Sequence, residues 1–215
     1  MILSIKNAIP STESEVTGRI VRRSLAKRES EYAAEVRRLL DAALELIGRG
    51  GTTTKPRVAD IVAASGLSND AFYRHFKSKD DLVAAILEDG AERLRSYLAH
   101  QMAKSATPDG QVRQWVKGVL AQADPDIAAA TLAVLWNGGI AGGGLAAGRH
   151  FASTPLASLL TEPFRELGST SPDLDAALAA HATLGMLSDY LWRHVVPTRA
   201  DIDHITAFCV RAATH

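Results

Sequence analysis

Polar and basic side chains gather between residues 57 and 79, and their types suit recognition of a nucleic acid. Asn69 and Asp70 can hydrogen-bond to base edges, while Tyr73 and Lys79 can donate to phosphate oxygens. The candidate nucleic-acid contacts are Arg57, Ser68, Asn69, Asp70, Ala71, Tyr73, Arg74, His75 and Lys79. They can act together only if the chain presents them on one surface.

The elements that must present them are predicted to be two short helices, over 55–65 and 68–76, joined by a tight turn. Ile61 and Phe72 can pack the helices together, and Gly66 permits the positive φ that such a turn requires. Ser68 can cap the second helix. The residues directly after it then point outward, as in a recognition helix that enters the major groove.

This pattern resembles the N-terminal signature of the TetR family. The resemblance covers about residues 30–87 and rests on Ile61, Gly66-Leu67-Ser68, Phe72-Tyr73-Arg74-His75-Phe76 and Ser78-Lys79-Asp80. It implies a dimeric transcription repressor whose N-terminal head binds operator DNA and whose C-terminal body takes a small effector. It also implies that Tyr73, His75 and Lys79 touch the DNA backbone, and that Asn69, Asp70 and Ala71 read bases.

Three residues depart from the family pattern. Ala71 stands where threonine is common, Asp70 where glycine is common, and Arg57 where threonine often opens the first helix of the pair. A carboxylate beside phosphates is repulsive unless it accepts from cytosine N4 or caps its helix. Asp70 therefore either alters operator preference or has a structural task.

The net charge of zero hides an asymmetry along the chain. Residues 19–79 hold 13 Lys and Arg against 7 Asp and Glu, whereas residues 80–215 hold 10 against 15. A basic head on an acidic body is typical of a nucleic-acid-binding protein, although such offsets also arise on solvated faces. Residues 1–28 are interpreted as a flexible basic arm that either reaches DNA or is a solvated tail or part of a longer first helix.

Composition favours an all-α fold, because Leu and Ala abound and alternating β-branched runs are almost absent. We expect the arm at 1–28, a three-helix helix-turn-helix DNA-binding domain at 29–78, and a helical ligand-binding and dimerisation domain at 79–215. Further helices are predicted at about 30–47, 78–100, 111–123, 126–136, 154–167, 172–195 and 198–213. Ser30 and Ser78 are candidate N-caps.

The last two predicted helices are the expected homodimer interface, as the family resemblance implies. Small residues there would allow close approach of helices. The candidate interface residues are Leu174, Leu178, Gly185, Ser188, Leu191, Ile205 and Phe208. Some of them must instead belong to the ordinary core of one chain.

A mostly apolar cavity with a few polar groups is the usual form of a small-molecule site. The candidate lining residues are Trp115, Trp136, Asn137, His150, Phe151, His181, Met186 and Tyr190, for each of which core packing is the alternative. A glycine cluster from Gly138 to Gly148 can kink a helix, gate this pocket or form a surface loop.

Other classes of protein find little support. The single cysteine, Cys209, excludes a disulfide framework and fits a reducing cytoplasm, and no secretory signal or membrane span is expected. No His-Glu-x-x-His spacing, serine elbow or phosphate loop is present, so neither an enzyme, a metal site nor a cofactor is expected. The remaining alternative is a DNA-binding regulator controlled by a partner protein instead of a small molecule.

Overall fold

The structure is a computed structural model that describes residues 12–138 and 155–213 of the chain. Every regular element in these ranges is helical, which confirms the all-α prediction. The helices are α1 (Thr12–Gly50), α2 (Val58–Ser65), α3 (Asn69–His75), α4 (Lys79–Met102), α5 (Pro108–Leu120), the 3₁₀ turn η1 (Ala121–Ala123), α6 (Pro125–Asn137), α8 (Thr161–Glu166), α9 (Pro172–Arg193) and α10 (Arg199–Ala213).

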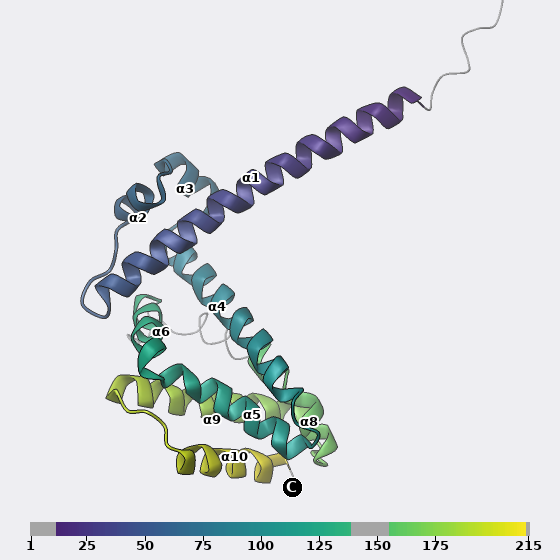
Figure 1. Ribbon diagram of the computed structural model, residues 1–215, viewed down its shortest axis with the longest axis vertical. Helices are drawn as coiled ribbons and strands as arrows, with labels where there is room; N and C mark the ends of the chain where they lie inside the picture. Colours follow the sequence, from purple (N-terminus) through teal and green to yellow (C-terminus); the bar gives the residue numbers. More distant parts are fainter. Residues whose placement is uncertain (1–11, 139–154, 214–215) are drawn as a thin grey trace, which may run out of the picture.

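Two packed units share one connecting helix. The head consists of α1, α2, α3 and the start of α4 through Leu87, and the body comprises the described residues after Leu87 (Figure 1). Leu39, Ile61 and Phe72 are fully buried in the head core. The separate body core contains Trp115 and Phe164.

Helix α4 belongs to both units, because its residues enter both cores. Leu82 and Ile86 pack in the head, whereas Leu98 and Met102 pack in the body. Helix α6 also crosses the boundary, since Ala133 is buried in the head core. The expected division at residue 78 therefore does not separate two independent cores, and movement of α4 or α6 would be felt by both units.

Helix α1 begins at Thr12, so the prediction of a helix start near Ser30 was wrong and Ser30 lies within the helix. The interpretation of residues 1–28 as a flexible arm fails for the part from Thr12 onward, and residues 1–11 lie outside the described ranges. Arg, Ala, Leu and Lys are good helix formers. A helix nucleated by the packed segment can extend through them without burying a face.

Local sequence explains several other helix starts. The side chains of Thr107 and Asp124 accept hydrogen bonds from the first turns of α5 and α6, and each helix has proline directly after the cap. The helix predicted over 154–167 is interrupted, because residues 155–157 are helical, residues 158–160 form a turn, and α8 begins at Thr161. This start places Pro163 in the first turn, where its missing N–H costs no hydrogen bond.

Within the described ranges, no single helix is long and apolar enough to cross a membrane. One pair of helices, Pro108–Ala123 with Pro125–Asn137, is together long and apolar enough to do so, and the two are bent by 80° relative to each other.

Candidate nucleic-acid interface and cavity

The turn between α2 and α3 has the predicted helix-turn-helix geometry. Gly66 adopts the left-handed conformation with φ of 64°, and Ser68 Oγ accepts from the backbone N–H of Ala71 at 3.1 Å. The Arg38 guanidinium on α1 donates to the carbonyl of Ser65 at 2.6 and 3.1 Å and to that of Gly66 at 3.2 Å. The turn is thereby tied to α1, which sets the angle at which α3 leaves it.

Helix α3 presents a short polar face to solvent. Asn69, Asp70 and Tyr73 are exposed, and Tyr73 is 58% exposed. No hydrogen bond or ion pair of Asp70 is found among the described residues, and Ser68 supplies the side-chain cap of α3. The capping role considered for Asp70 is therefore filled by Ser68, and to the stability of the helix start Asp70 adds a favourable charge.

Ala71 does not lie on this face, since it is only 4% exposed and packs beside buried Phe72. The expectation that it reads bases is wrong for a geometric reason. Successive helix residues turn by about 100°, so three consecutive side chains cannot all face one groove. Base-edge contact is left to its two predecessors, Asn69 and Asp70.

His75 and Arg74 face α1 instead of open solvent. His75 Nε2 lies 2.7 Å and Arg74 Nη2 3.1 Å from Glu35 Oε2, and the His75 side chain is only 6% exposed. The hydrogen bond from His75, aided by Arg74, lowers the pKa of Glu35 below its ordinary value. Tyr32 adds an edge contact to the His75 ring, at 5.2 Å between centroids, and lies under Arg74.

The role expected for His75 at a DNA phosphate therefore disagrees with its position, because its ring is buried against α1. Arg74 is half-exposed but already paired. Both residues hold α3 against α1, so they orient the recognition surface in this structure.

The basic groups beside α3 differ in how free they are. Arg57 precedes α2 and forms an ion pair with Asp60, whose pKa is lowered by the Arg57 hydrogen bond. Lys79 is half-buried at the start of α4, next to Ser78, which caps that helix. Lys77 is exposed and its side chain has no partner among the described residues. Sequence reasoning missed Lys77, although its place between α3 and α4 was a usable signal.

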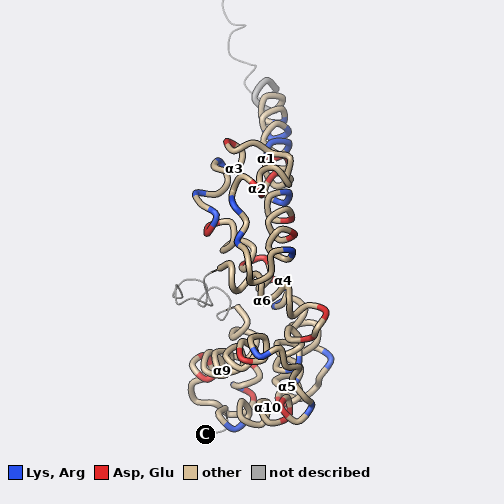
Figure 2. The backbone as a smooth tube through the Cα atoms, turned by 90° about the vertical axis from the view of Figure 1, so that its left-hand side faces the viewer, with Lys and Arg blue, Asp and Glu red and all other residues tan. Residues whose placement is uncertain are grey.

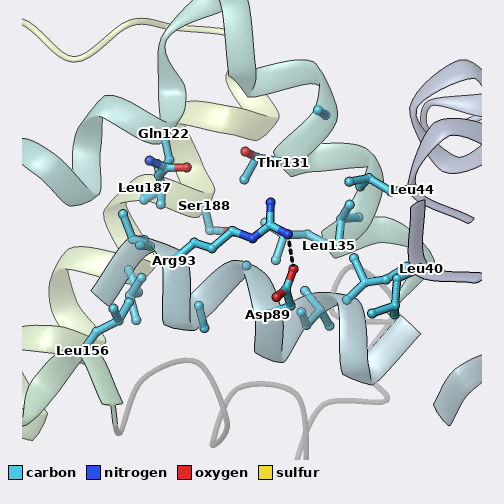
Figure 3. Close-up of a pocket in the computed structure, with 18 of the residues that line it drawn as sticks. Leu40, Leu44, Asp89, Arg93, Gln122, Thr131, Leu135, Leu156, Leu187 and Ser188 are labelled. Atoms are coloured by element: carbon cyan, nitrogen blue, oxygen red, sulfur yellow. Dashed lines mark ion pairs between the residues drawn. The ribbon is translucent and has the colours of Figure 1, made fainter. Parts of the chain in front are cut away.

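A cavity of about 450 Å³ lies where head and body meet (Figure 3). Its walls come mainly from α1, α4, α6 and α9. The lining residues are Leu40, Asp41, Leu44, Ile86, Leu87, Asp89, Gly90, Ala91, Arg93, Leu94, Gln122, Ala130, Thr131, Val134, Leu135, Leu156, His181, Leu184, Gly185, Leu187 and Ser188. Most of the lining is apolar.

A charge cluster connects this cavity to the head. Asp89 Oδ2 lies 2.7 Å from Arg93 Nη2 within the cavity, the pair marked in Figure 3. The same carboxylate oxygen lies 3.8 Å from Arg37 Nη1 on α1. A molecule that displaces Arg93 would therefore act on a carboxylate that also contacts the head.

His181 is the only predicted ligand contact, among those the structure describes, that lines the cavity. Trp115 is fully buried in the body core, where its Nε1 donates to the Leu156 carbonyl at 2.9 Å. Tyr190 is buried beside Asp201, and Met186 is exposed away from the cavity lining. Large aromatic side chains filled the core here instead of forming a pocket wall.

The other predicted ligand contacts also lie elsewhere. The Lys55 ammonium lies over the Trp136 ring, 4.8 Å from the ring centroid, at the junction with the head. Asn137 is buried and donates to the Ala133 carbonyl, while its Oδ1 has no partner among the residues that the structure describes. His150, Phe151 and all of the glycine cluster after Gly138 lie outside the described residues.

The predicted dimer residues divide into three groups. Leu174 and Leu178 on α9 and Phe208 on α10 are 61%, 59% and 49% exposed. Leu191 and Ile205 are buried in the body core. Gly185 and Ser188 line the cavity. The buried pair was assigned to an interface because core and interface residues have the same helical spacing.

Metal chemistry has no visible basis in residues 12–138 and 155–213, where no group of His, Cys, Asp or Glu is placed to hold an ion. Cys209 is a buried free cysteine whose Sγ lies 3.9 Å from Thr183 Oγ1, and burial raises the pKa of its thiol.

Residues 39–86 match the model of the bacterial regulatory proteins of the tetR family. No match is found among curated proteins.

Crystal structures with the same fold share little sequence with this chain. A regulatory protein of the tetR family from Rhodococcus RHA1 is 19% identical, with 83% of this chain and 96% of that chain covered and a TM-score of 0.55. RolR in complex with resorcinol is 16% identical, with 85% and 89% covered and a TM-score of 0.63. FadR from Bacillus subtilis in complex with stearoyl-CoA is 17% identical, with 83% and 97% covered and a TM-score of 0.55.

Proposed function

The chain belongs to the TetR family of transcriptional regulators, and we propose that it is a repressor that a small effector releases from an inverted-repeat operator. It is a DNA-binding protein and not an enzyme. The observation that carries the proposal is the exposed polar face of α3 in a turn anchored to α1.

Two residues of that face suit base readout. Asn69 can pair with adenine through both of its amide groups, and Asp70 can accept from cytosine N4. Both are exposed and lie in the first turn of α3. Tyr73, Lys77 and Lys79 follow them in the chain, and their side chains can donate to phosphate oxygens. We therefore expect the operator to have adenine or cytosine at the positions that Asn69 and Asp70 contact.

The DNA-binding test uses Tyr73→Phe and Lys79→Ala, with Tyr97→Phe and Lys104→Ala on the body as matched controls. Removal of a group that binds phosphate should weaken binding to specific and random DNA alike. Removal of Lys79 from both protomers of the dimer should flatten the salt dependence by about 1.8 in log–log slope. The body controls should bind as the parent does. Unchanged affinity in both head variants would contradict the assignment of this surface.

The cavity is our proposed effector site. Its volume of about 450 Å³ falls within the range of small-molecule sites, and its lining is apolar with a few polar groups. RolR and FadR, which share the fold, are described with resorcinol and with stearoyl-CoA. We infer an organic effector with an apolar body whose polar group meets Arg93, Gln122 or His181.

Release follows from the position of the cavity. Leu40 and Leu44 come from α1 of the head, while Leu184 comes from α9 of the body. A ligand there contacts both units, and it favours whichever relative arrangement it fits best. In the proposed mechanism, that arrangement moves the two heads of a dimer out of register with adjacent major grooves. DNA affinity then falls by the factor by which the ligand binds this arrangement more tightly than the DNA-bound one.

The second copy is proposed to dock on α9 and α10. Leu174, Leu178 and Phe208 are large apolar side chains that remain exposed in one chain. An interface between two identical faces would cover them and give the two-fold symmetry that inverted half-sites require. A monomer at micromolar concentration would rule this arrangement out.

Gly90 offers a direct test of the cavity. A Cβ at this position would meet nothing within 4 Å, and Gly90 lines the cavity. Gly90→Leu should therefore partly fill the site. Gly48→Leu, on exposed α1 with equal space around its Cβ, is the control.

The readout is a thermal-shift screen with small apolar compounds, followed by DNA binding with each compound that stabilises the protein. Gly90→Leu should keep DNA binding and lose the thermal shift, while the control keeps both. A compound that acts equally on Gly90→Leu binds elsewhere. If no compound shifts the parent, control by a partner protein becomes the better account.

A further inference from the structure

Helix α1 continues far beyond the part of the head that packs against it. Helix α3 reaches α1 at Tyr32 and Glu35, and every residue from Arg19 to Ala34 is exposed. From Thr12 to Glu31 the helix is about 30 Å long at about 1.5 Å per residue. We call Thr12–Glu31 the α1 extension.

The extension holds five Lys and Arg against Glu13, Glu15, Glu29 and Glu31. Among the described side chains, which begin at Val16, Arg19, Arg22, Arg23 and Arg28 make no ion pair or hydrogen bond, whereas Lys27 pairs with Glu31 at 3.7 Å. Arg19, Arg22 and Arg23 share one face, since they are three and four residues apart. Arg28 lies one turn before Tyr32, toward α3. Guanidinium groups suit phosphate recognition because their donors match its oxygens.

The direction of the extension places this charge beside the recognition surface. In Figure 1 it projects past α3, and in Figure 2 its Lys and Arg positions lie beside α3 and beyond it, at the end of the head away from the body. A duplex lying on α3 would continue past that helix. The length of the extension is close to one DNA turn of about 34 Å.

We propose that the α1 extension is a second DNA-binding surface, which contacts the phosphate backbone of the duplex flanking each half-site. The inference rests on the proposed function of the head. The phosphate contacts of the extension would add affinity without sequence preference. It predicts that DNA beyond the bases read by α3 strengthens binding.

The test variant changes Arg19, Arg22, Arg23 and Arg28 to Ala in the full chain. Alanine preserves the helix. A charge-matched control changes four exposed basic residues of the body: Lys104, Lys117, Arg165 and Arg199. Affinity is measured against salt for operator probes that end at the half-sites and for probes longer by about 10 base pairs, or one turn, at each end.

The parent should bind the longer probe more tightly, and the arginine variant should bind both probes alike. Its log–log salt slope on the longer probe should fall by about 4 to 7, because the dimer loses eight arginines and each phosphate that the variant no longer neutralises reduces the slope by about 0.9. Its order of preference among operator sequences should stay that of the parent, and circular dichroism should report unchanged helix content.

Three outcomes would overturn the inference. One is an unchanged salt slope and flank dependence, and another is an equal loss in the body control, which would indicate a general charge effect. The third is loss of flank dependence in Val21→Ala/Leu25→Ala but not in the arginine variant. Val21 and Leu25 are 50% and 57% exposed, so that result would indicate pairing of apolar faces between copies. Absence of operator binding by the parent itself would instead refute the proposed function.

Discussion

The recognition surface and the cavity are built in opposite ways. The residues proposed to form the recognition surface around α3 lie within one short stretch from Asn69 to Lys79, and their positions follow from two N-caps and one left-handed glycine. The cavity instead joins residues as distant as Leu40 and Ser188. Local chemistry determines the first, whereas the packing of remote helices determines the second.

This contrast also separates how the two regions can fail. The head surface depends on the turn that aims α3, so a change there should remove DNA binding and spare the cavity. The cavity depends on how α1, α4, α6 and α9 meet, so it should be lost when the body core is disturbed. Four predictions test this separation, from the largest effect to the smallest.

The largest effect is expected from emptying either core. Phe72 and Phe164 are both fully buried, the first in the head and the second in the body. Phe72→Ala and Phe164→Ala should each cost about 3 to 5 kcal/mol in the free energy of unfolding. DNA binding should be measured while each variant is denatured. Phe72→Ala should lose DNA binding at a lower denaturant concentration than Phe164→Ala does. Equal loss of every function in both variants would show that head and body do not separate.

A smaller loss is expected from Arg38→Ala. The guanidinium makes hydrogen bonds to the carbonyls of Ser65 and Gly66, and charged hydrogen bonds of this kind contribute about 1 to 3 kcal/mol. The neighbouring Arg37→Ala, which loses only a 3.8 Å ion pair, is the control. Urea denaturation should rank the two, and an Arg37 variant as unstable as the Arg38 variant would contradict this role.

The same substitution should have opposite signs at two glycines. Gly66 has φ of 64° and a Cβ there would meet Arg38 Nη2 at 3.0 Å, so Gly66→Ala should destabilise the head by about 1 to 2 kcal/mol. Gly90 lies within α4 with open space around it, so Gly90→Ala should stabilise by about 0.5 to 1 kcal/mol. Thermal unfolding of the two variants measures both signs.

The smallest effect concerns Glu35 and pH. Its pKa is lowered from 4.5 by the His75 hydrogen bond and by Arg74, so its stabilising contribution is present above pH 4.5 and is lost as the pH falls through the lowered pKa. Glu35→Gln should therefore be less stable than the parent near neutral pH, and the difference should shrink in acid. A difference that grows on acidification would contradict the pairing.

Helix type and the helix-turn-helix were predictable because capping serines and Gly66 act over a few residues. The start of α1 was not, since Arg19–Arg28 forms a helix with no buried face to reveal its period. His75 and Ala71 were misplaced because a motif gives residue types but not the partner across the fold, which for His75 is Glu35. The lining of the cavity was predicted wrongly because Trp115 and Tyr190 were expected to form its wall. Their polar groups instead find partners within the core, so both side chains are buried there.

The most direct test of the central claim is selection of bound fragments from the host genome with the parent and with Asn69→Ala/Asp70→Ala. The parent should enrich an inverted repeat whose half-site centres lie about 34 to 36 Å apart along the DNA or a multiple of one turn. The double variant should lose or change the preferred bases at fixed positions in each half-site. Enrichment of the same sequence by both proteins would contradict base reading by α3.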